Sequence, residues 1–197
     1  MKFVNEFSEE MLSEGSHMCK CRFLVSNKEF CEICENPPTE RLSWDNYFIK
    51  ILKAVSERGT CNRGKSGCIF TRDNRILVTG YVGSPPGFPH CDEEGHLLKK
   101  VFNEDNTISE HCVRTVHAEI NAICDAAKRG ISLECSTVYV TMTPCRSCAM
   151  ALISCDVARI VCLNKYQRAQ ESEELFEIAK IPVFYINEEV LDYSKKD

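Results

Sequence analysis

Four residues in the second half of the chain have the types and the spacing of a metal-dependent hydrolytic site. His117 and Glu119 stand two positions apart in "HAE", and Cys145 and Cys148 stand three positions apart in "PCRSC". Zinc takes imidazole and thiolate ligands tetrahedrally, and three protein ligands leave the fourth position for water. A carboxylate beside such a site is suited to move protons. We therefore predict that His117, Cys145 and Cys148 bind zinc and that Glu119 carries protons.

The cysteine pair alone admits four interpretations. Cys145 and Cys148 could form a disulfide, a redox couple, a structural zinc knuckle or part of a catalytic metal site. Knuckles and redox pairs are the commoner uses of C-x-x-C, and a lone histidine on a helix is usually a packed core residue. A redox couple has no need of His117 and Glu119, however. The joint occurrence of all four residues, each near a predicted helix start, favours the catalytic site.

Regular elements surround these residues in an alternating order. Helical periodicity that ends at glycine predicts helices, and apolar runs bounded by turn residues predict strands. The predicted helices cover 44–59, 116–130, 144–155 and 171–180, and the predicted strands cover 67–72, 75–82, 137–142, 158–163 and 181–186. Strands that alternate with helices in short units predict an α/β fold with a partly parallel sheet.

This alternation brings the two halves of the predicted metal site together. Strand 137–142 separates the helix that begins near His117 from the helix that begins near Cys145, so the two helix starts meet at one edge of the sheet. Thr143 is suited to cap the second helix, and Pro144 to occupy its first position. The positive end of the helix dipole favours thiolate over thiol there.

Composition and length narrow the class of protein. No run in the 197 residues approaches the ~18 apolar residues of a membrane helix, and the start "MKFVNEFSEE" lacks the features of a secretory signal. We therefore expect a cytoplasmic protein with no membrane partner, whose 14 cysteines bind metal or pack in the core. The net charge of −5 and the lack of a basic face argue against a nucleic-acid partner.

The length suits one domain with an appendage. Residues 1–42 lack sustained periodicity and end in the proline pair of "ENPPTERLS", so we predict a cysteine-rich N-terminal appendage. Residues 43–197 form the predicted catalytic domain. Within it, residues 83–112 are rich in turn residues and polar groups, and we predict a long functional loop inserted there.

The motifs extend into a wider resemblance. "HAE" followed by "PCRSC" is the H-x-E and P-C-x-x-C signature of zinc-dependent nucleobase deaminases. Together with "TGYVGSPPGFPHCDEEGHL", "HCVRTVHAEINAI", "STVYVTMTPCRSCAMALI" and "ARIVC", it resembles the deoxycytidylate deaminase family of the cytidine deaminase-like superfamily. The resemblance covers roughly residues 44–187 and implies a three-layer α/β/α fold with a mixed sheet of about five strands.

The resemblance also implies an activity. Members of the family hydrolyse dCMP to dUMP and ammonia in pyrimidine deoxynucleotide metabolism, with zinc held at the positions of His117, Cys145 and Cys148. Glu119 would take a proton from water and pass protons to N3 of the cytosine ring and to the departing amine. Members form oligomers and often respond to dCTP as activator and dTTP as inhibitor, so a homo-oligomer with these effectors is expected.

Substrate recognition departs from the family pattern at one position. The family usually has "GYNG" where this chain has "GYVG", and Val82 replaces an asparagine that is expected to contact the sugar. A valine side chain cannot form that hydrogen bond. Lys128 stands where some members bind the 5′-phosphate, although a solvated lysine is as common near a helix end. Val82, Lys128 and Asn121 are the predicted substrate-binding positions.

Two further groups of cysteines predict structural zinc. The resemblance implies a second zinc that clips the insertion to the end of the first helix, with candidate ligands Cys61, Cys91, Cys112 and one histidine of His90, His96 and His111, of which we assign His96. The pairs in "CKC" and "CEIC" predict a zinc knuckle in the appendage, with ligands Cys19, Cys21, Cys31 and Cys34. The remaining cysteines are predicted to be small core residues.

Three other functions fit parts of this pattern. The valine in the substrate loop is also compatible with a deaminase of another free cytosine nucleotide or nucleoside. A nucleic-acid-editing deaminase shares the zinc signature, but it needs a basic groove for a single strand. A zinc-stabilised binding module is the third alternative, although a structural zinc has no use for a carboxylate such as Glu119 beside an open coordination position.

Overall fold

The computed structural model describes residues 16–18, 24–26, 41–102, 108–167, 169–187 and 190–191. The chain divides into two compact units, Met1–Ser43 and Trp44–Asp197. In the first unit, β1 (Ser16–Met18) pairs antiparallel with β2 (Leu24–Ser26). The four cysteines of the predicted knuckle, Cys19, Cys21, Cys31 and Cys34, lie outside the described residues, so the knuckle remains a prediction.

The second unit is built on a mixed sheet. Its strands lie in the order β4 (Arg75–Tyr81), β3 (Gly67–Arg72), β7 (Thr137–Met142), β8 (Arg159–Tyr166) and β9 (Val183–Tyr185). Strand β3 runs antiparallel to both of its neighbours, whereas β7, β8 and β9 are parallel. The short β10 (Val190–Leu191) pairs with the last two residues of β8. The predicted five-stranded mixed sheet is confirmed, with β10 as an addition to it.

The hairpin between β3 and β4 follows from two residues. Asp73 and Asn74 form its turn with φ values of 51° and 58°. Short polar side chains tolerate this left-handed region better than others do, and a turn with two such residues matches the twist of the flanking strands. The two predicted strands 67–72 and 75–82 therefore form an antiparallel hairpin.

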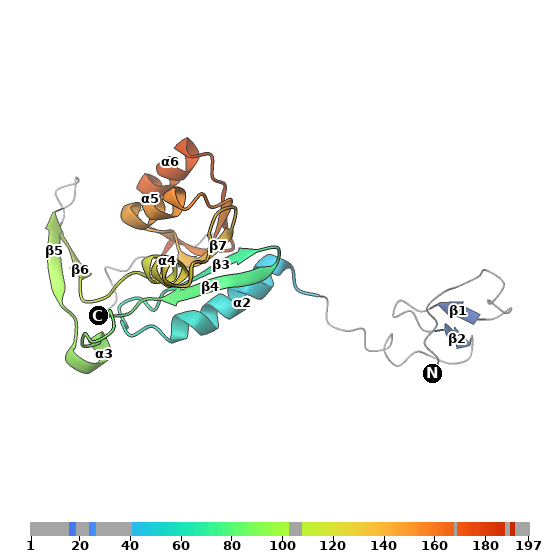
Figure 1. Cartoon of the computed structure of the whole chain (residues 1–197), viewed down its shortest axis with the longest axis horizontal. Helices are drawn as coiled ribbons and strands as arrows, with labels where there is room; N and C mark the ends of the chain where they lie inside the picture. Colours follow the sequence, from blue (N-terminus) through green and yellow to red (C-terminus); the bar gives the residue numbers. More distant parts are fainter. Residues whose placement is uncertain are drawn as a thin grey trace. The chain divides into compact units, whose positions relative to one another are not determined.

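Helices cover both faces of the sheet (Figure 1). Helix α2 (Trp44–Glu57) packs Phe48 and Leu52 against Ile69 on one face. The other face is covered by α4 (Ala118–Arg129), α5 (Arg146–Ser154) and α6 (Gln170–Ile178). Because neighbouring residues of a strand point to opposite faces, Cys68 and Phe70 join this second core while Ile69 joins the first. The result is the expected α/β/α arrangement.

The insertion is more regular than its composition suggests. Residues 83–112 contain the one-turn helix α3 (Cys91–Glu94) and an antiparallel hairpin of β5 (Leu98–Phe102) with β6 (Ile108–Cys112). The segment predicted as a long functional loop therefore contains regular secondary structure. These strands pair with each other and not with the main sheet, and three of their residues are lysine or glutamate, so they lack the apolar alternation by which a strand is recognised.

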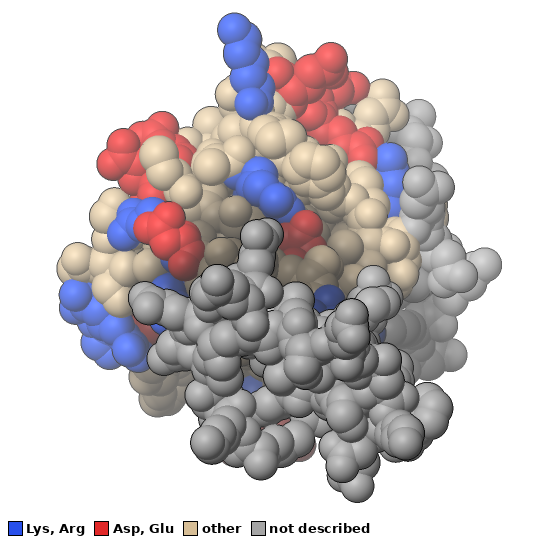
Figure 2. Space-filling view, turned by 90° about the vertical axis from the view of Figure 1, so that its right-hand side faces the viewer, with Lys and Arg blue, Asp and Glu red and all other residues tan. Residues whose placement is uncertain are grey.

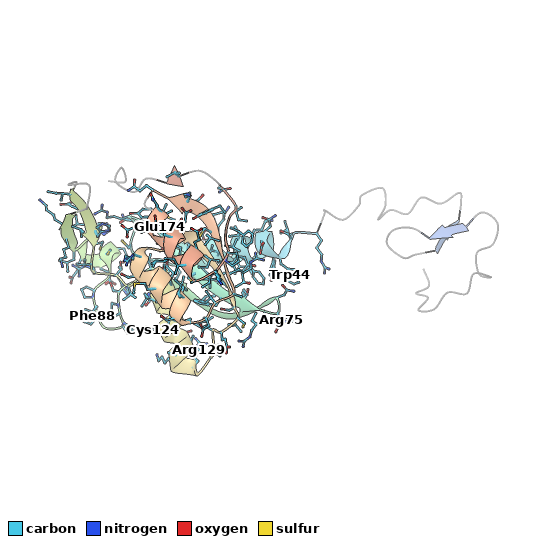
Figure 3. All side chains as sticks on the ribbon, turned by 90° about the horizontal axis from the view of Figure 1, so that it is seen from above. Trp44, Arg75, Phe88, Cys124, Arg129 and Glu174 are labelled. Carbon is cyan, nitrogen blue, oxygen red and sulfur yellow. The ribbon has the colours of Figure 1, made fainter. Side chains whose placement is uncertain are left out.

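The surface of the second unit mixes both signs of charge. On the face shown in Figure 2, the basic and acidic side chains of the described residues lie interspersed. Single side chains such as Cys124, Arg129 and Glu174 project from the helices (Figure 3). Among the helices in the part of the chain that is described, none is long and apolar enough to cross a membrane.

Candidate active site and second metal site

His117 is placed by the close approach of α4 to the edge strand β4. It is the N-cap of α4, with extended backbone angles, and the preceding Val116 exchanges two backbone hydrogen bonds with Gly83. A side chain at Gly80 of β4 would lie only 2.2 Å from the Ala118 carbonyl oxygen. Glycine at this position therefore allows the first turn of α4, which carries Glu119, to pack directly on the sheet.

Cys145 and Cys148 are placed by the turn between β7 and α5. Cys145 is the N-cap of α5 and Cys148 lies in its first turn. The predictions that Thr143 caps this helix and that Pro144 is its first residue were wrong, because α5 begins at Arg146. The Thr143 hydroxyl instead accepts a hydrogen bond from the Tyr166 backbone N–H at 3.1 Å, so a tertiary contact replaces the local cap.

The three predicted ligands meet as the sequence indicated. His117 Nδ1 lies 3.5 Å from Cys145 Sγ and 3.4 Å from Cys148 Sγ, and all three ligand atoms lie within 4.8 Å of one another. Tetrahedral zinc with bonds of ~2.0–2.3 Å holds nitrogen and sulfur ligands roughly 3.5 Å apart. One imidazole and two thiols at this spacing fit a zinc ion, and Glu119 is not part of the ligand group.

Without a metal, the three ligand groups of the site differ in protonation. A hydrogen bond from the Cys148 thiol, helped by one from His117, lowers the pKa of Cys145 to about 4 despite its burial. The bond with Cys145 raises the pKa of His117 to about 9, and the bond with Cys145 and burial raise the pKa of Cys148 well above its ordinary value. A metal ion that binds all three must therefore displace one proton from His117 and one from Cys148 at neutral pH.

Glu119 has the environment of a proton carrier. Its side chain is buried, with only 8% of the residue exposed. Burial raises its pKa, although His117 and a hydrogen bond from Cys148 act in the opposite direction. A carboxyl group with a raised pKa takes up a proton more readily than an ordinary carboxylate, which favours general acid and base chemistry.

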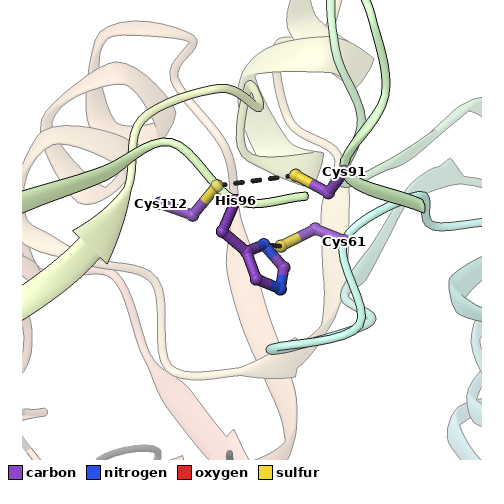
Figure 4. Close-up of side chains that lie close together, drawn as sticks. All are labelled: Cys61, Cys91, His96 and Cys112. Atoms are coloured by element: carbon purple, nitrogen blue, oxygen red, sulfur yellow. Dashed lines mark hydrogen bonds between the residues drawn. The ribbon is translucent and has the colours of Figure 1, made fainter. Parts of the chain in front are cut away.

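A second group of possible ligand atoms joins three residues of the insertion to one residue that follows α2 (Figure 4). Its four residues are Cys61, Cys91, His96 and Cys112, and their ligand atoms lie within 4.8 Å of one another. Cys61 Sγ is 3.7 Å from His96 Nδ1, and Cys91 Sγ is 3.5 Å from Cys112 Sγ. Three thiols and one imidazole are a complete ligand set for structural zinc. Of the three histidines considered, the structure brings His96 to the cysteines, whereas His90 bonds to Thr60.

The electrostatics of the second group also favour a metal. Burial alone would raise the pKa of Cys112, but hydrogen bonds from the Arg114 backbone and the His96 ring lower it to about 7. Burial and the bond with Cys112 raise the pKa of Cys91 to about 12. The lowered pKa of Cys112 favours the thiolate form that binds a divalent cation, whereas Cys91 would lose its proton when the metal binds.

The structure does not bring the three predicted substrate residues together. Val82 is 6% exposed and packs with Cys61 and Cys91. Its side chain therefore contacts two of the residues in the second group of ligands. Asn121 donates from Nδ2 to the Tyr81 carbonyl at 2.8 Å and thereby ties α4 to the end of β4. Lys128 is exposed, and eleven residues of helix place it about 16 Å along the axis from His117. Within one chain it is therefore remote from Glu119.

Replacing Val82 by the family's asparagine should destabilise the protein. The amide would be buried against Cys61, Cys91 and Gly59, where an added Cβ on Gly59 would already lie 2.9 Å from Val82 Cγ1. We expect Val82→Asn to lower the free energy of unfolding by ~1–3 kcal/mol, measured by urea denaturation. Val113→Asn, at a half-exposed valine, should change it by less than about 0.5 kcal/mol. A stabilised Val82→Asn protein would contradict this placement.

Sequence reasoning missed several residues that build the site. Gly80 sets the approach of α4, and Ser172 on α6 donates a 2.7 Å hydrogen bond to the carbonyl of Pro144. Tyr185 in β9 bonds to the Thr143 hydroxyl at 3.2 Å. None of these could be read from local periodicity, because each acts on a residue far away in the sequence.

The fold and the site together define a zinc-binding α/β domain, and comparison with known proteins identifies its family. The profile described as "Cytidine and deoxycytidylate deaminase zinc-binding region" matches residues 42–164. ComE operon protein 2 of Bacillus subtilis is 33% identical over 160 residues, which cover 80% of each chain. The chain belongs to the cytidine and deoxycytidylate deaminase family.

Enzymes of known activity lie among its relatives. The deoxycytidylate deaminase of Enterobacteria phage T2 is 31% identical, over 70% of this chain and 89% of the phage protein. That of Saccharomyces cerevisiae is 29% identical, but the match spans only 46% of the yeast protein. The cyanophage S-TIM5 dCMP deaminase in complex with dCMP and dUMP superposes on 72% of this chain with a TM-score of 0.59 and 25% identity. The expected deaminase fold is therefore confirmed.

Proposed function

We propose that this protein is a zinc-dependent hydrolase that converts dCMP and water to dUMP and ammonia. The observation that carries the proposal is a cluster of one imidazole and two thiols, next to which lies the buried carboxyl group of Glu119. Relatives named deoxycytidylate deaminase, and a solved relative that binds dCMP and dUMP, support the choice of substrate. The reaction belongs to pyrimidine deoxynucleotide metabolism.

The residues of the site divide the chemistry between them. His117, Cys145 and Cys148 would hold zinc, and bound zinc supplies the Lewis acidity that makes water nucleophilic at neutral pH. Glu119 accepts one proton from that water and delivers it to N3 of cytosine, and it then takes the second proton from the new hydroxyl group at C4 and delivers it to the departing amino group. The C4–N bond breaks, a C4–O bond forms and ammonia leaves. Because Glu119 is buried, its proton is held close to the reacting atoms and is not lost to solvent.

The substrate can be tested directly with a panel of nucleotides. We expect the purified full-length protein to deaminate dCMP with a kcat/KM at least ~10-fold above that for CMP, dCTP or deoxycytidine, because a difference of one phosphate or hydroxyl contact is worth about 1.4 kcal/mol or more. Absorbance of the cytosine ring measures each reaction. Because Val82 replaces the family's asparagine, a deaminase of another free cytosine nucleotide or nucleoside is the alternative. A preference for CMP, dCTP or deoxycytidine would assign the protein to that alternative.

We further propose that the enzyme is a cytoplasmic homo-oligomer controlled by dCTP and dTTP. Every cysteine that the structure describes carries a free thiol, which supports a reducing compartment. Large apolar side chains remain exposed on the second unit, including Trp44 at 54% and Ile178 at 80%, and such side chains are typical of surfaces that are covered by another copy. The net charge of −5, with both signs interspersed on the face shown in Figure 2, supports a small-molecule substrate and not a nucleic acid.

A further inference from the structure

The side chain of Cys145 makes no capping hydrogen bond to the helix that it precedes. At an N-cap the side chain usually accepts a hydrogen bond from the first turn of the helix, which fixes the entry of the chain. Cys145 occupies the N-cap of α5 but makes no such bond, and its sulfur faces His117 instead. The backbone of this turn is therefore held by the bond from the Ala149 N–H to the Cys145 carbonyl at 2.8 Å and by contacts from elsewhere in the fold.

One external contact is made by Ser172. This residue lies in the first turn of α6 and is only 1% exposed. Its hydroxyl donates to the Pro144 carbonyl oxygen at 2.7 Å. That carbonyl belongs to the peptide group that joins Pro144 to Cys145, so the bond fixes the orientation of the backbone from which the first thiolate projects.

A second contact is a chain of hydrogen bonds that ends on the preceding residue. Tyr185 donates its phenol hydrogen to Glu173 Oε1 at 2.7 Å, so at its 3.2 Å contact with Thr143 the phenol oxygen accepts. Thr143 in turn accepts from the Tyr166 N–H, and Glu173 is also paired with Lys165 at 2.7 Å. Each hydroxyl of the chain thus donates once and accepts once, which leaves a single orientation for the Thr143 side chain.

Both contacts come from a part of the chain without an assigned role. Ser172, Glu173 and Tyr185 all lie beyond the family-matched residues 42–164. Packing alone would not require them, because Phe176 at 0% exposure already anchors α6 in the core. Ser172 and Thr143 are buried, and buried polar groups are costly unless they are paired. The convergence of these hydrogen bonds on two consecutive residues of the metal-binding turn therefore indicates a specific use.

We propose that Ser172 and the Thr143–Tyr185–Glu173 chain are positioning residues for the Cys145–Cys148 ligand pair. They hold the turn before α5 in the conformation that places both sulfur atoms beside His117. The inference rests on the proposed function in one respect, namely that Cys145 and Cys148 bind the catalytic zinc. It extends the site from its ligands to the segment that follows β8.

The test compares two serines that make the same type of bond. Ser172→Ala removes the bond to Pro144, and Ser154→Ala removes an exposed hydroxyl that donates to the Met150 carbonyl within α5. Zinc affinity is measured on the full-length protein by competition with a chromophoric chelator. The zinc of this site is identified as the fraction that Cys145→Ser lacks. We expect Ser172→Ala to bind it ~10-fold or more weakly and Ser154→Ala to stay within about twofold of the wild type.

A spectroscopic measurement separates positioning from simple destabilisation. In the cobalt(II)-substituted protein, the thiolate-to-metal and d–d absorption bands report ligand geometry. They should shift in Ser172→Ala and in Tyr185→Phe, and Ser172→Thr, which keeps the hydroxyl, should restore them. If Ser172→Ala does not fold, judged by circular dichroism, Tyr185→Phe decides the question alone.

Folded variants with wild-type zinc affinity and unchanged cobalt bands would overturn the inference. None of these measurements requires turnover. A protein that fails to deaminate dCMP but loses zinc affinity in Ser172→Ala would therefore disprove the proposed substrate and leave the positioning role intact.

Discussion

Glu119→Gln is expected to lower kcat for dCMP deamination by ~10³-fold, within the range that general acid–base residues contribute. Glutamine has the shape of the neutral carboxyl group but cannot accept a proton from water or return one to N3 of the base. Glu119→Ala, which also removes the shape, should abolish turnover. Steady-state assays by loss of cytosine absorbance measure both variants.

The same variants should keep their zinc and their fold. Glu119 is not among the ligand atoms that cluster around His117, so metal content should equal that of the wild type. Burial already favours the neutral form of Glu119, and the neutral glutamine should therefore change the free energy of unfolding by less than about 1 kcal/mol. Loss of zinc from either variant would contradict the role of a proton carrier and would make Glu119 a ligand or a structural residue.

A matched control separates the effect of position from that of charge. Glu174→Gln makes the same substitution at an exposed residue of α6, where the side chain bonds only to Gln170 of its own helix in the described contacts. It should retain kcat within about twofold, since surface substitutions away from the site have small effects. Equal losses at Glu119 and Glu174 would attribute the effect to net charge and not to proton transfer.

The main elements of the fold could be predicted because local chemistry determines them. The Asp73–Asn74 turn adopts a conformation that these residue types tolerate, and Gly130 ends α4 with a φ of 67°. The clustering of His117, Cys145 and Cys148 was predictable for a related reason. His117 and Cys145 each begin a helix that follows a strand or an extended segment, and parallel strand order brings such helix starts to one edge of the sheet.

The errors arise where contacts distant in sequence outweigh local preference. Thr143 has the residue type of a helix cap, but the Tyr166 N–H and the Tyr185 hydroxyl engage it instead. The burial of Val82 with Cys61 and Cys91 is likewise a contact with residues distant in sequence. The roles of Val82 and Lys128 in substrate binding remain predictions.

Removal of the second metal site should cause the largest loss of stability. Its ligands come from four separate segments: Cys61 after α2, Cys91 at the start of α3, His96 before β5, and Cys112 at the end of β6. A metal that joins them closes several loops at once, and the free energy of binding adds to that of folding. We expect Cys112→Ser to lower the free energy of unfolding by ~3 kcal/mol and the melting temperature by roughly 10 °C.

Zinc stoichiometry provides an independent measurement of the same site. Cys112→Ser should contain one zinc fewer than the wild type, and so should Cys145→Ser at the catalytic site, while the double variant should lack two. Cys124→Ser, at an exposed cysteine of α4, should change neither the zinc content nor the melting temperature. Equal zinc content in Cys112→Ser and Cys124→Ser would show that the four residues bind no metal.

Loss of the second metal should also lower the activity, because a short series of contacts connects the second site to the active site. Val82 packs on Cys61 and Cys91, and the next residue, Gly83, pairs with Val116 directly before His117. If the second metal fixes this path, Cys112→Ser should reduce kcat for dCMP at a temperature where the variant is still folded. Unchanged kcat below the melting transition would confine the second site to a role in stability.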